Sequence, residues 1–165
     1  IGICEDVLFV VQYLKYTYGS ITFTDSALYH YRKMPNGSTN SRYKKGVKLQ
    51  KKQLTEFYAI DNCKQYLVAD WRVEDAWTQR AVKGAVTDIR AMIASGEDYA
   101  DEYSIRLRYV KKNLRNYITG NIGAKSAKIS ALLCAISPRL EYIIWKMMNE
   151  GLKKYEKSWN NDVVS

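Results

Sequence analysis

Residues 103–117 read YSIRLRYVKKNLRNY, and this stretch decides the fold class of the chain. Its large apolar and aromatic side chains recur every three or four residues, at Tyr103, Leu107, Val110, Leu114 and Tyr117. This spacing places them along one side of an amphipathic α-helix. The other sides should carry the basic residues Arg106, Arg108, Lys111, Lys112 and Arg115. The stretch therefore predicts a helix that buries its apolar side and ends near Gly120.

The segments before this helix repeat the same spacing. One set of apolar residues marks a helix that should stop near Gly96: Val82, Val86, Ile89 and Ile93. An earlier set marks another helix: Leu49, Phe57, Ile60 and Leu67. Because these patterns follow one another from Gly46 onward, the sequence predicts a helical region over residues 46–165.

The C-terminal segment divides into two further helices. The first runs from about Ala124 to Ile136, and Ser137 and Pro138 then restart the chain. Serine is a favoured N-cap. Proline suits the first helical position because it has no N–H, and an N–H at that position would have no partner within the helix. The last helix carries Leu140, Ile143, Ile144, Met147 and Met148.

The N-terminal 45 residues are more varied. Residues 5–18 have helical spacing and precede Gly19, whereas 21–24 and 27–31 are rich in β-branched and aromatic residues. Turn-forming residues dominate 34–42, which should be a loop. The fold class expected for the whole chain is therefore mainly α with a small β element.

Composition excludes several classes of protein. The chain has 165 residues, of which 47% are hydrophobic and 26% charged, so it should fold as a domain rather than remain disordered. Its longest apolar run, 131–136, is too short to cross a bilayer. A single histidine, His30, excludes zinc sites that need several imidazoles, and no metal ligand is predicted. Three scattered cysteines indicate a reducing compartment, hence a cytoplasmic location.

Positive charge is concentrated in the last third of the chain. Residues 1–102 carry 14 Lys and Arg against 13 Asp and Glu, whereas residues 103–165 carry 12 against 4. Such asymmetry indicates an anionic partner for the C-terminal helices. One interpretation is peripheral contact with the inner face of a membrane, and the other is a solvated basic face over an ordinary core.

Two other function classes remain as alternatives. A basic helical module that binds nucleic acid should show aromatic side chains interleaved with Lys and Arg on one exposed face. The apolar stripe of residues 103–117 is expected to be buried instead, so a nucleic-acid partner is disfavoured. The second alternative is a structural helical adaptor without catalytic residues.

The order of motifs in the first 45 residues resembles a known enzyme family. Cys4-Glu5-Asp6 opens a helix, Leu28-Tyr29-His30-Tyr31-Arg32 follows in a strand-like stretch, and Gly37-Ser38-Thr39-Asn40 forms a loop. This order is similar to the closing section of the nucleotide-binding domain in family 2 glycosyltransferases of the GT-A fold. The family's loop carries an isoleucine that is missing here. The resemblance implies the end of a GT-A α/β domain over 1–45, followed by a helical region over 46–165.

The resemblance assigns roles to individual residues. Asp6 corresponds to the catalytic base, which takes the proton of the acceptor hydroxyl, and Glu5 would orient the acceptor or support the helix start. Arg32, His30 and Ser38 would lie at the donor diphosphate, for which a guanidinium is a suitable partner. The alternatives are that Arg32 ends a strand at the surface and that His30 is an ordinary strand residue.

The resemblance also implies partners and a cofactor. The whole enzyme would bind a nucleotide-sugar donor and a saccharide or lipid-linked acceptor, with Mg²⁺ or Mn²⁺ neutralising the departing diphosphate. The aspartate-rich metal motif of the family would lie upstream of Ile1, so no cation is expected in these 165 residues. Because the chain starts at Ile1 and lacks the donor half, it is expected to be part of a longer protein and inactive alone.

Overall fold

The computed structural model describes residues 5–17, 22, 49, 54, 56–66, 71–121 and 123–163. At residues 5, 6, 64, 71 and 72, and from 151 onward, it describes the backbone alone. These residues form six α-helices and one short 3₁₀ helix: α1 Glu5–Tyr16, α3 Glu56–Cys63, η2 Lys64–Tyr66, α4 Trp71–Ser95, α5 Ala100–Thr119, α6 Lys125–Ile136 and α7 Pro138–Val163. The fold is thus mainly α, as the sequence predicts.

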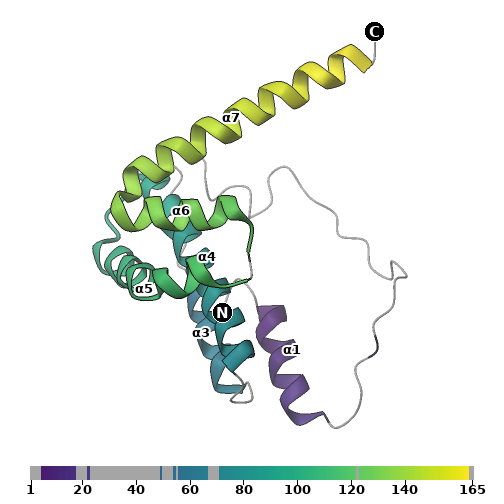
Figure 1. Ribbon diagram of the computed structural model, residues 1–165, viewed down its shortest axis with the longest axis vertical. Helices are drawn as coiled ribbons and strands as arrows, with labels where there is room; N and C mark the ends of the chain where they lie inside the picture. The colour runs from purple at the N-terminus through teal and green to yellow at the C-terminus, as the bar shows by residue number, and fades with distance from the viewer. Residues whose placement is uncertain are drawn as a thin grey trace.

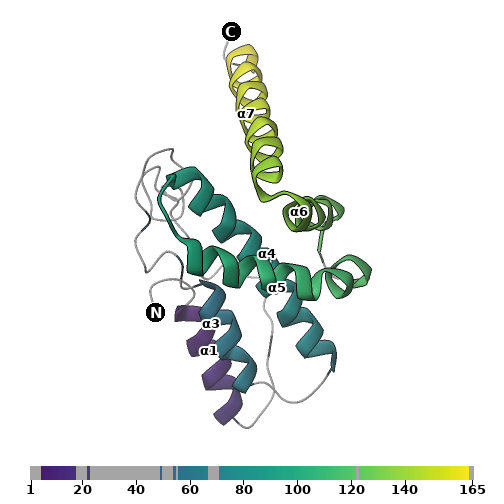
Figure 2. The same cartoon turned by 90° about the vertical axis from the view of Figure 1, so that its left-hand side faces the viewer.

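Helix α4 is the centre of the molecule, because α3, α5, α6 and α7 all pack against it (Figures 1 and 2). Its buried apolar residues recur at helical spacing, at Val82, Ala85, Val86 and Ile89. They meet Phe57 of α3, Val110 and Tyr117 of α5, and Ala131 and Cys134 of α6. The apolar periods of separate helices therefore join in one core.

A second apolar cluster lies at the C-terminal end of α4. It joins Ala91 and Met92 to Leu49 and Leu54, with Tyr99 and Tyr103 packed against it. Leu49 is buried but is not helical, so the helix predicted from Leu49 to Leu67 is wrong at its start. Leu49 packs at the end of α4, where the Tyr99 hydroxyl donates to its carbonyl at 3.4 Å.

The predicted helix ends are confirmed. Helix α4 stops at Ser95, and Gly96 adopts φ +73°, a left-handed conformation that favours glycine. Helix α5 stops at Thr119, and Gly120 caps it by donating its N–H to the Asn116 carbonyl. The apolar stripe of α5 lies against the core, with Val110 and Tyr117 fully buried.

Helices α6 and α7 meet at a corner made by one residue, Ser137. Its N–H donates to the Leu133 carbonyl at 2.7 Å and closes α6, while its Oγ accepts the Leu140 N–H at 3.5 Å and starts α7. Pro138 occupies the first helical position, so the predicted N-cap is confirmed. The far half of α7 extends away from the other helices (Figures 1 and 2).

The N-terminal helix α1 packs against α3 and buries Val11. It ends at Tyr16, two residues before the predicted end. The two predicted strands, 21–24 and 27–31, and the loop at 34–42 lie outside the described residues, apart from Thr22. The described residues contain no strand, and none of their helices is sufficiently long and apolar to cross a membrane.

Candidate functional site

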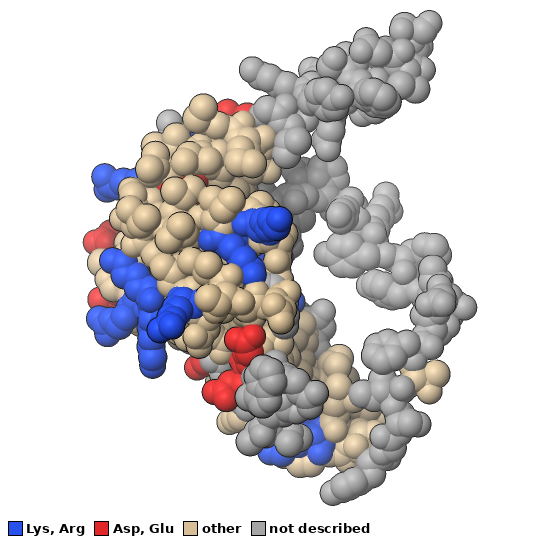
Figure 3. All heavy atoms as spheres, in the orientation of Figure 1, with Lys and Arg blue, Asp and Glu red and all other residues tan. Residues whose placement is uncertain are grey.

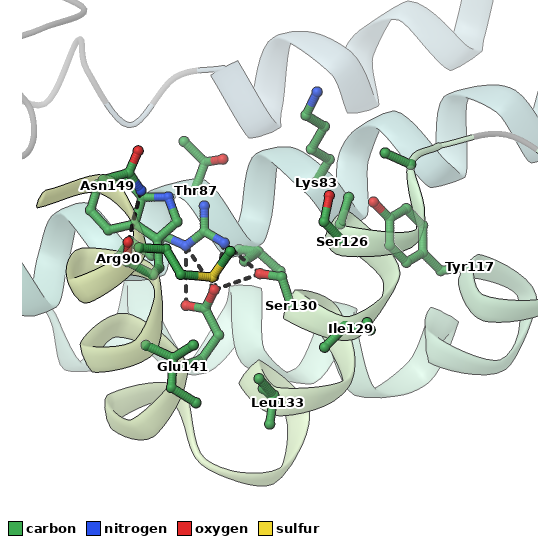
Figure 4. A pocket seen from close by; sticks show the side chains of 16 residues that line it. Lys83, Thr87, Arg90, Tyr117, Ser126, Ile129, Ser130, Leu133, Glu141 and Asn149 are labelled. Carbon is green, nitrogen blue, oxygen red and sulfur yellow. Dashed lines mark hydrogen bonds and ion pairs between the residues drawn. The ribbon is translucent and has the colours of Figure 1, made fainter. Parts of the chain in front are cut away.

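An open cleft of about 390 Å³ lies between α4, α6 and α7 (Figure 4). Its apolar walls include Val86, Leu133, Ile144, Trp145 and Met148. Polar groups also line it, at Lys83, Thr87, Ser126 and Asn149. Apolar walls with a few polar groups are typical of a binding site for a small molecule or a side chain.

The polar side of this cleft is organised around Arg90 of α4. Its Nε donates to both carboxylate oxygens of Glu141 in α7, at 2.9 and 3.1 Å, and its Nη2 reaches Glu141 and the hydroxyl of Ser130 in α6. Ser130 in turn donates to Glu141. Figure 4 shows these three side chains converging from three helices. Together they fix the relative positions of α4, α6 and α7.

The electrostatics of the cleft favour binding over catalysis. Glu141 is occupied by Arg90 and Ser130, and the Trp145 ring lies 5.1 Å from the guanidinium, so neither charge is free to act as a base or an acid. Nearby, burial raises the pKa of the Cys134 thiol to about 12, and burial also raises the pKa of Tyr117. Neither group is an activated nucleophile at neutral pH.

A second charged cluster is sealed between α4 and α5. Arg106 is fully buried and donates to Asp88 at 2.8 Å, to the Leu54 carbonyl at 2.6 Å and to the Glu102 carboxylate. Burial lowers the pKa of Arg106, but the charges and hydrogen bonds of Asp88 and Glu102 outweigh this effect and raise it. The expectation that Arg106 lies on the solvent side of its helix is therefore wrong.

The spacing of residues in the sequence contains the signal that identifies both arginines. Arg106 follows Tyr103 by three residues and precedes Val110 by four, so it belongs to the buried stripe. Arg90 likewise follows Val86 by four residues and precedes Ile93 by three. A charged residue within an apolar stripe must find a partner, which sequence periodicity alone does not identify.

The residues predicted from the sequence lie elsewhere. Glu5 and Asp6 form the first turn of α1, and their side chains are outside the described structure. His30, Arg32 and Ser38 also lie outside the described residues. Helix α1 is at the opposite end of the molecule from α7 (Figures 1 and 2). The cleft and the predicted catalytic pair are therefore separate features.

Helix α5 presents a basic face that bears on the nucleic-acid alternative. Its exposed cations are Arg108, Lys111, Lys112 and Arg115, and Figure 3 shows Lys and Arg side chains gathered over this helix. No tyrosine of α5 is fully exposed, and Tyr109 packs edge-on against Phe57 at 5.0 Å. The aromatic platform that single-stranded nucleic acid requires is therefore missing from the described α5 face.

Within the described part of the chain, no group of three or more His, Cys, Asp or Glu side chains could hold a metal ion. Comparison of the chain with protein-family models, with curated proteins and with solved structures gave no match.

Proposed function

We propose that this chain is the C-terminal part of an inverting family 2 glycosyltransferase, in which Asp6 is the general base. The observation that carries the proposal is the order of motifs in residues 4–40. An acidic pair opens a helix, an aromatic Tyr-x-Tyr-Arg stretch follows, and a Gly-Ser-Thr-Asn loop comes next. Each motif is weak alone, and their order and spacing carry the argument.

The helical boundaries support this proposal. Helix α1 starts at Glu5, so the acidic pair stands in its first turn, where backbone N–H groups and the helix dipole favour carboxylates. Adjacent residues at a helix start point in different directions, so the pair is unsuited to flank one glycosidic bond as a hydrolase requires.

The surface of α1 gives a second line of support. While Val11 faces α3, the opposite side exposes three aromatic rings: Phe9 at 67%, Tyr13 at 59% and Tyr16 at 69%. Phe9 and Tyr13 stack with 6.3 Å between ring centroids. An aromatic surface of this kind is typical of a protein interface. In the proposed enzyme this side of α1 packs against the donor-binding half of the GT-A domain.

The proposed chemistry is a single displacement. The carboxylate of Asp6 accepts the proton of an acceptor hydroxyl as that oxygen attacks the anomeric carbon of the donor, and the nucleoside diphosphate leaves. Attack from the side opposite the leaving group inverts the anomeric configuration. Glu5 orients the acceptor, while Arg32, His30 and Ser38 contact the diphosphate.

The test is Asp6→Asn in the protein extended by its upstream coding sequence. We expect kcat to fall about 10²- to 10⁴-fold with donor binding unchanged, because the variant keeps the shape but cannot accept the proton. The matched control is Asp101→Asn, which changes an exposed aspartate in the first turn of α5. Equal activity of the Asp6 variant and the control would favour the adaptor alternative.

Two further observations bear on the proposal. The coding sequence before Ile1 should contain an Asp-x-Asp at the end of a strand. Residues 1–165 alone should neither bind a sugar nucleotide tightly nor transfer sugar, which isothermal titration calorimetry and product analysis would measure. Turnover by this chain alone would refute the assignment of the donor half to upstream residues.

A further inference from the structure

Helices α6 and α7 each expose a row of large apolar side chains. On α6 the row is Ile129, Leu132 and Ile136, and on α7 it is Leu140, Ile143 and Met147. Members of each row are three or four residues apart, so they follow one side of their helix. Their exposed fractions range from 41% for Leu132 to 73% for Ile136. We call these six residues the apolar ridge.

The apolar ridge continues across the corner between the two helices. Ile136 ends the α6 row and Leu140 begins the α7 row, on either side of Ser137. The opposite sides of the same helices are buried, at Ala131 and Cys134 of α6 and at Glu141 of α7. The ridge residues therefore do not contribute to the core of the described structure. A contiguous exposed apolar surface of this kind usually marks an interaction site.

Positive charge accompanies the ridge. Lys125, Lys128, Arg139 and Lys146 lie on the same two helices, and three of the four are exposed. Residues 121–150 contribute two acids against these four cations: Glu141 is buried against Arg90, and Glu150 pairs with Lys146 at 3.7 Å. Lys128 is partly buried and donates to the Gly120 carbonyl, so the exposed excess of positive charge rests on Lys125 and Arg139. Figure 3 shows an uncharged surface over α6 and the start of α7 with Lys and Arg at its borders.

We infer that the apolar ridge is a docking surface for an anionic lipid bilayer. Exposed Leu, Ile and Met with a basic border are typical of helices that lie in the interface plane of a membrane. A nucleic acid would use the cations but would leave the apolar rows in water. A symmetric pair of chains would bring the same cations face to face. The inference does not depend on the glycosyltransferase proposal.

The experiment is flotation of the chain with two kinds of vesicle. One contains phosphatidylcholine alone, and the other contains phosphatidylcholine with a minor fraction of phosphatidylglycerol. We expect the chain to bind the anionic vesicles at least about tenfold more tightly and to be released by salt. Each neutralised ridge cation, as in Lys125→Gln, should weaken binding about fivefold.

Apolar variants separate docking from simple charge attraction. Ile143→Ser combined with Met147→Ser should weaken binding about tenfold or more, because two apolar side chains no longer enter the interface. Ile105→Ser is the matched control, since Ile105 is an exposed isoleucine on α5 outside the ridge. Thermal unfolding should be little changed in the double variant and in the Ile105 control, because the mutated side chains are exposed.

Other outcomes would overturn the inference. Equal binding by the double variant and the Ile105 control would show that the ridge does not enter the membrane. Loss of binding only in Lys111→Gln with Lys112→Gln would assign the contact to the basic face of α5. Sedimentation velocity supplies a further criterion, because a dimer that dissociates in the Ile143 and Met147 double variant would identify a second copy as the occupant.

Discussion

Arg106 and Arg90, two arginines of the described helices, differ in what surrounds them. Arg106 is fully enclosed and is held by Asp88, Glu102 and the Leu54 carbonyl. Arg90 has a similar set of partners in Glu141 and Ser130, yet its side chain keeps 14% of its exposure and lines the open cleft. An aromatic ring covers each guanidinium, from Phe57 and Trp145 respectively. The two arginines thus have similar partners, but Arg106 is sealed from solvent and Arg90 is accessible to it.

The difference shows that solvent access decides what such a pair does. A fully buried ion pair costs several kcal/mol of desolvation, and its partners must offset that cost with good geometry. Arg106 meets this requirement by tying α4, α5 and the segment before α3 together. Arg90 lines the open cleft with 14% of its side chain exposed, so solvent screens its pair and less desolvation has to be offset.

The largest effect should come from Arg106→Met. Removal of the guanidinium takes from the buried carboxylate of Asp88 the ion pair at 2.8 Å, so we expect a loss of about 3–5 kcal/mol in the free energy of unfolding. Chemical denaturation monitored by circular dichroism would measure it. The control is Arg108→Met, an exposed arginine on the same helix, which should change stability by less than about 0.5 kcal/mol. Similar losses in both variants would refute the role of burial.

Alkaline pH should produce the next largest effect, through Cys134 beside the Arg90 pair. Burial, followed by the charge of Glu141, raises the pKa of this thiol to about 12, whereas Arg90 lowers it. The folded state then holds its proton more tightly than the unfolded state, so stability is full below about pH 9 and falls as pH rises toward 12. The loss attributable to this group is about 4 kcal/mol at most.

Denaturation curves collected across that pH range would check this expectation. Cys134→Ala should flatten the pH dependence, although Tyr117, Tyr103 and Tyr58, whose pKa values burial also raises, will leave part of the slope. An unchanged slope in the variant would show that Cys134 ionises without resistance and would contradict the enclosed environment seen here.

A smaller loss should follow from Glu141→Gln. The amide keeps the shape of the carboxylate and can still accept a hydrogen bond from Arg90, and the guanidinium can turn to water in the cleft. We therefore expect a loss of about 1–3 kcal/mol, less than that of Arg106→Met. Thermal and chemical unfolding of the two variants side by side would measure the difference. A larger loss from Glu141→Gln would reverse the proposed ranking.

The helical framework was accessible from the sequence because it depends on local chemistry. Apolar spacing predicts α5 and α6, Gly96 predicts the end of α4, and Ser137 with Pro138 predicts the corner. The start of α4 at Trp71 could not be predicted from the sequence, because the first turns of this helix carry no clear apolar period. The sequence assigns Leu49 to a helix together with Phe57 and Ile60, whereas the structure shows Leu49 as a buried, non-helical residue.

The cleft could not be predicted because its residues meet only in the folded chain. Arg90 and Glu141 are 51 residues apart, and Arg106 reaches Leu54 across 52. Periodicity identifies which side of a helix is buried, but it does not identify which helix covers that side. The acidic pair Glu5 and Asp6 is the opposite case, because motif order in the sequence suggests a catalytic role and that role stays a prediction.

The smallest effect is expected at the rim of the sealed cluster, from Tyr58→Phe. The Tyr58 hydroxyl donates to Glu102 at 2.8 Å, and burial together with this carboxylate raises the pKa of the tyrosine. Because Tyr58 is 38% exposed and Glu102 remains bound by Arg106, water can replace the lost hydroxyl. We expect a loss of about 0.5–1 kcal/mol by chemical denaturation. A loss matching that of Arg106→Met would mean that the orientation of Glu102, rather than the buried charge of Asp88, holds α4 and α5 together.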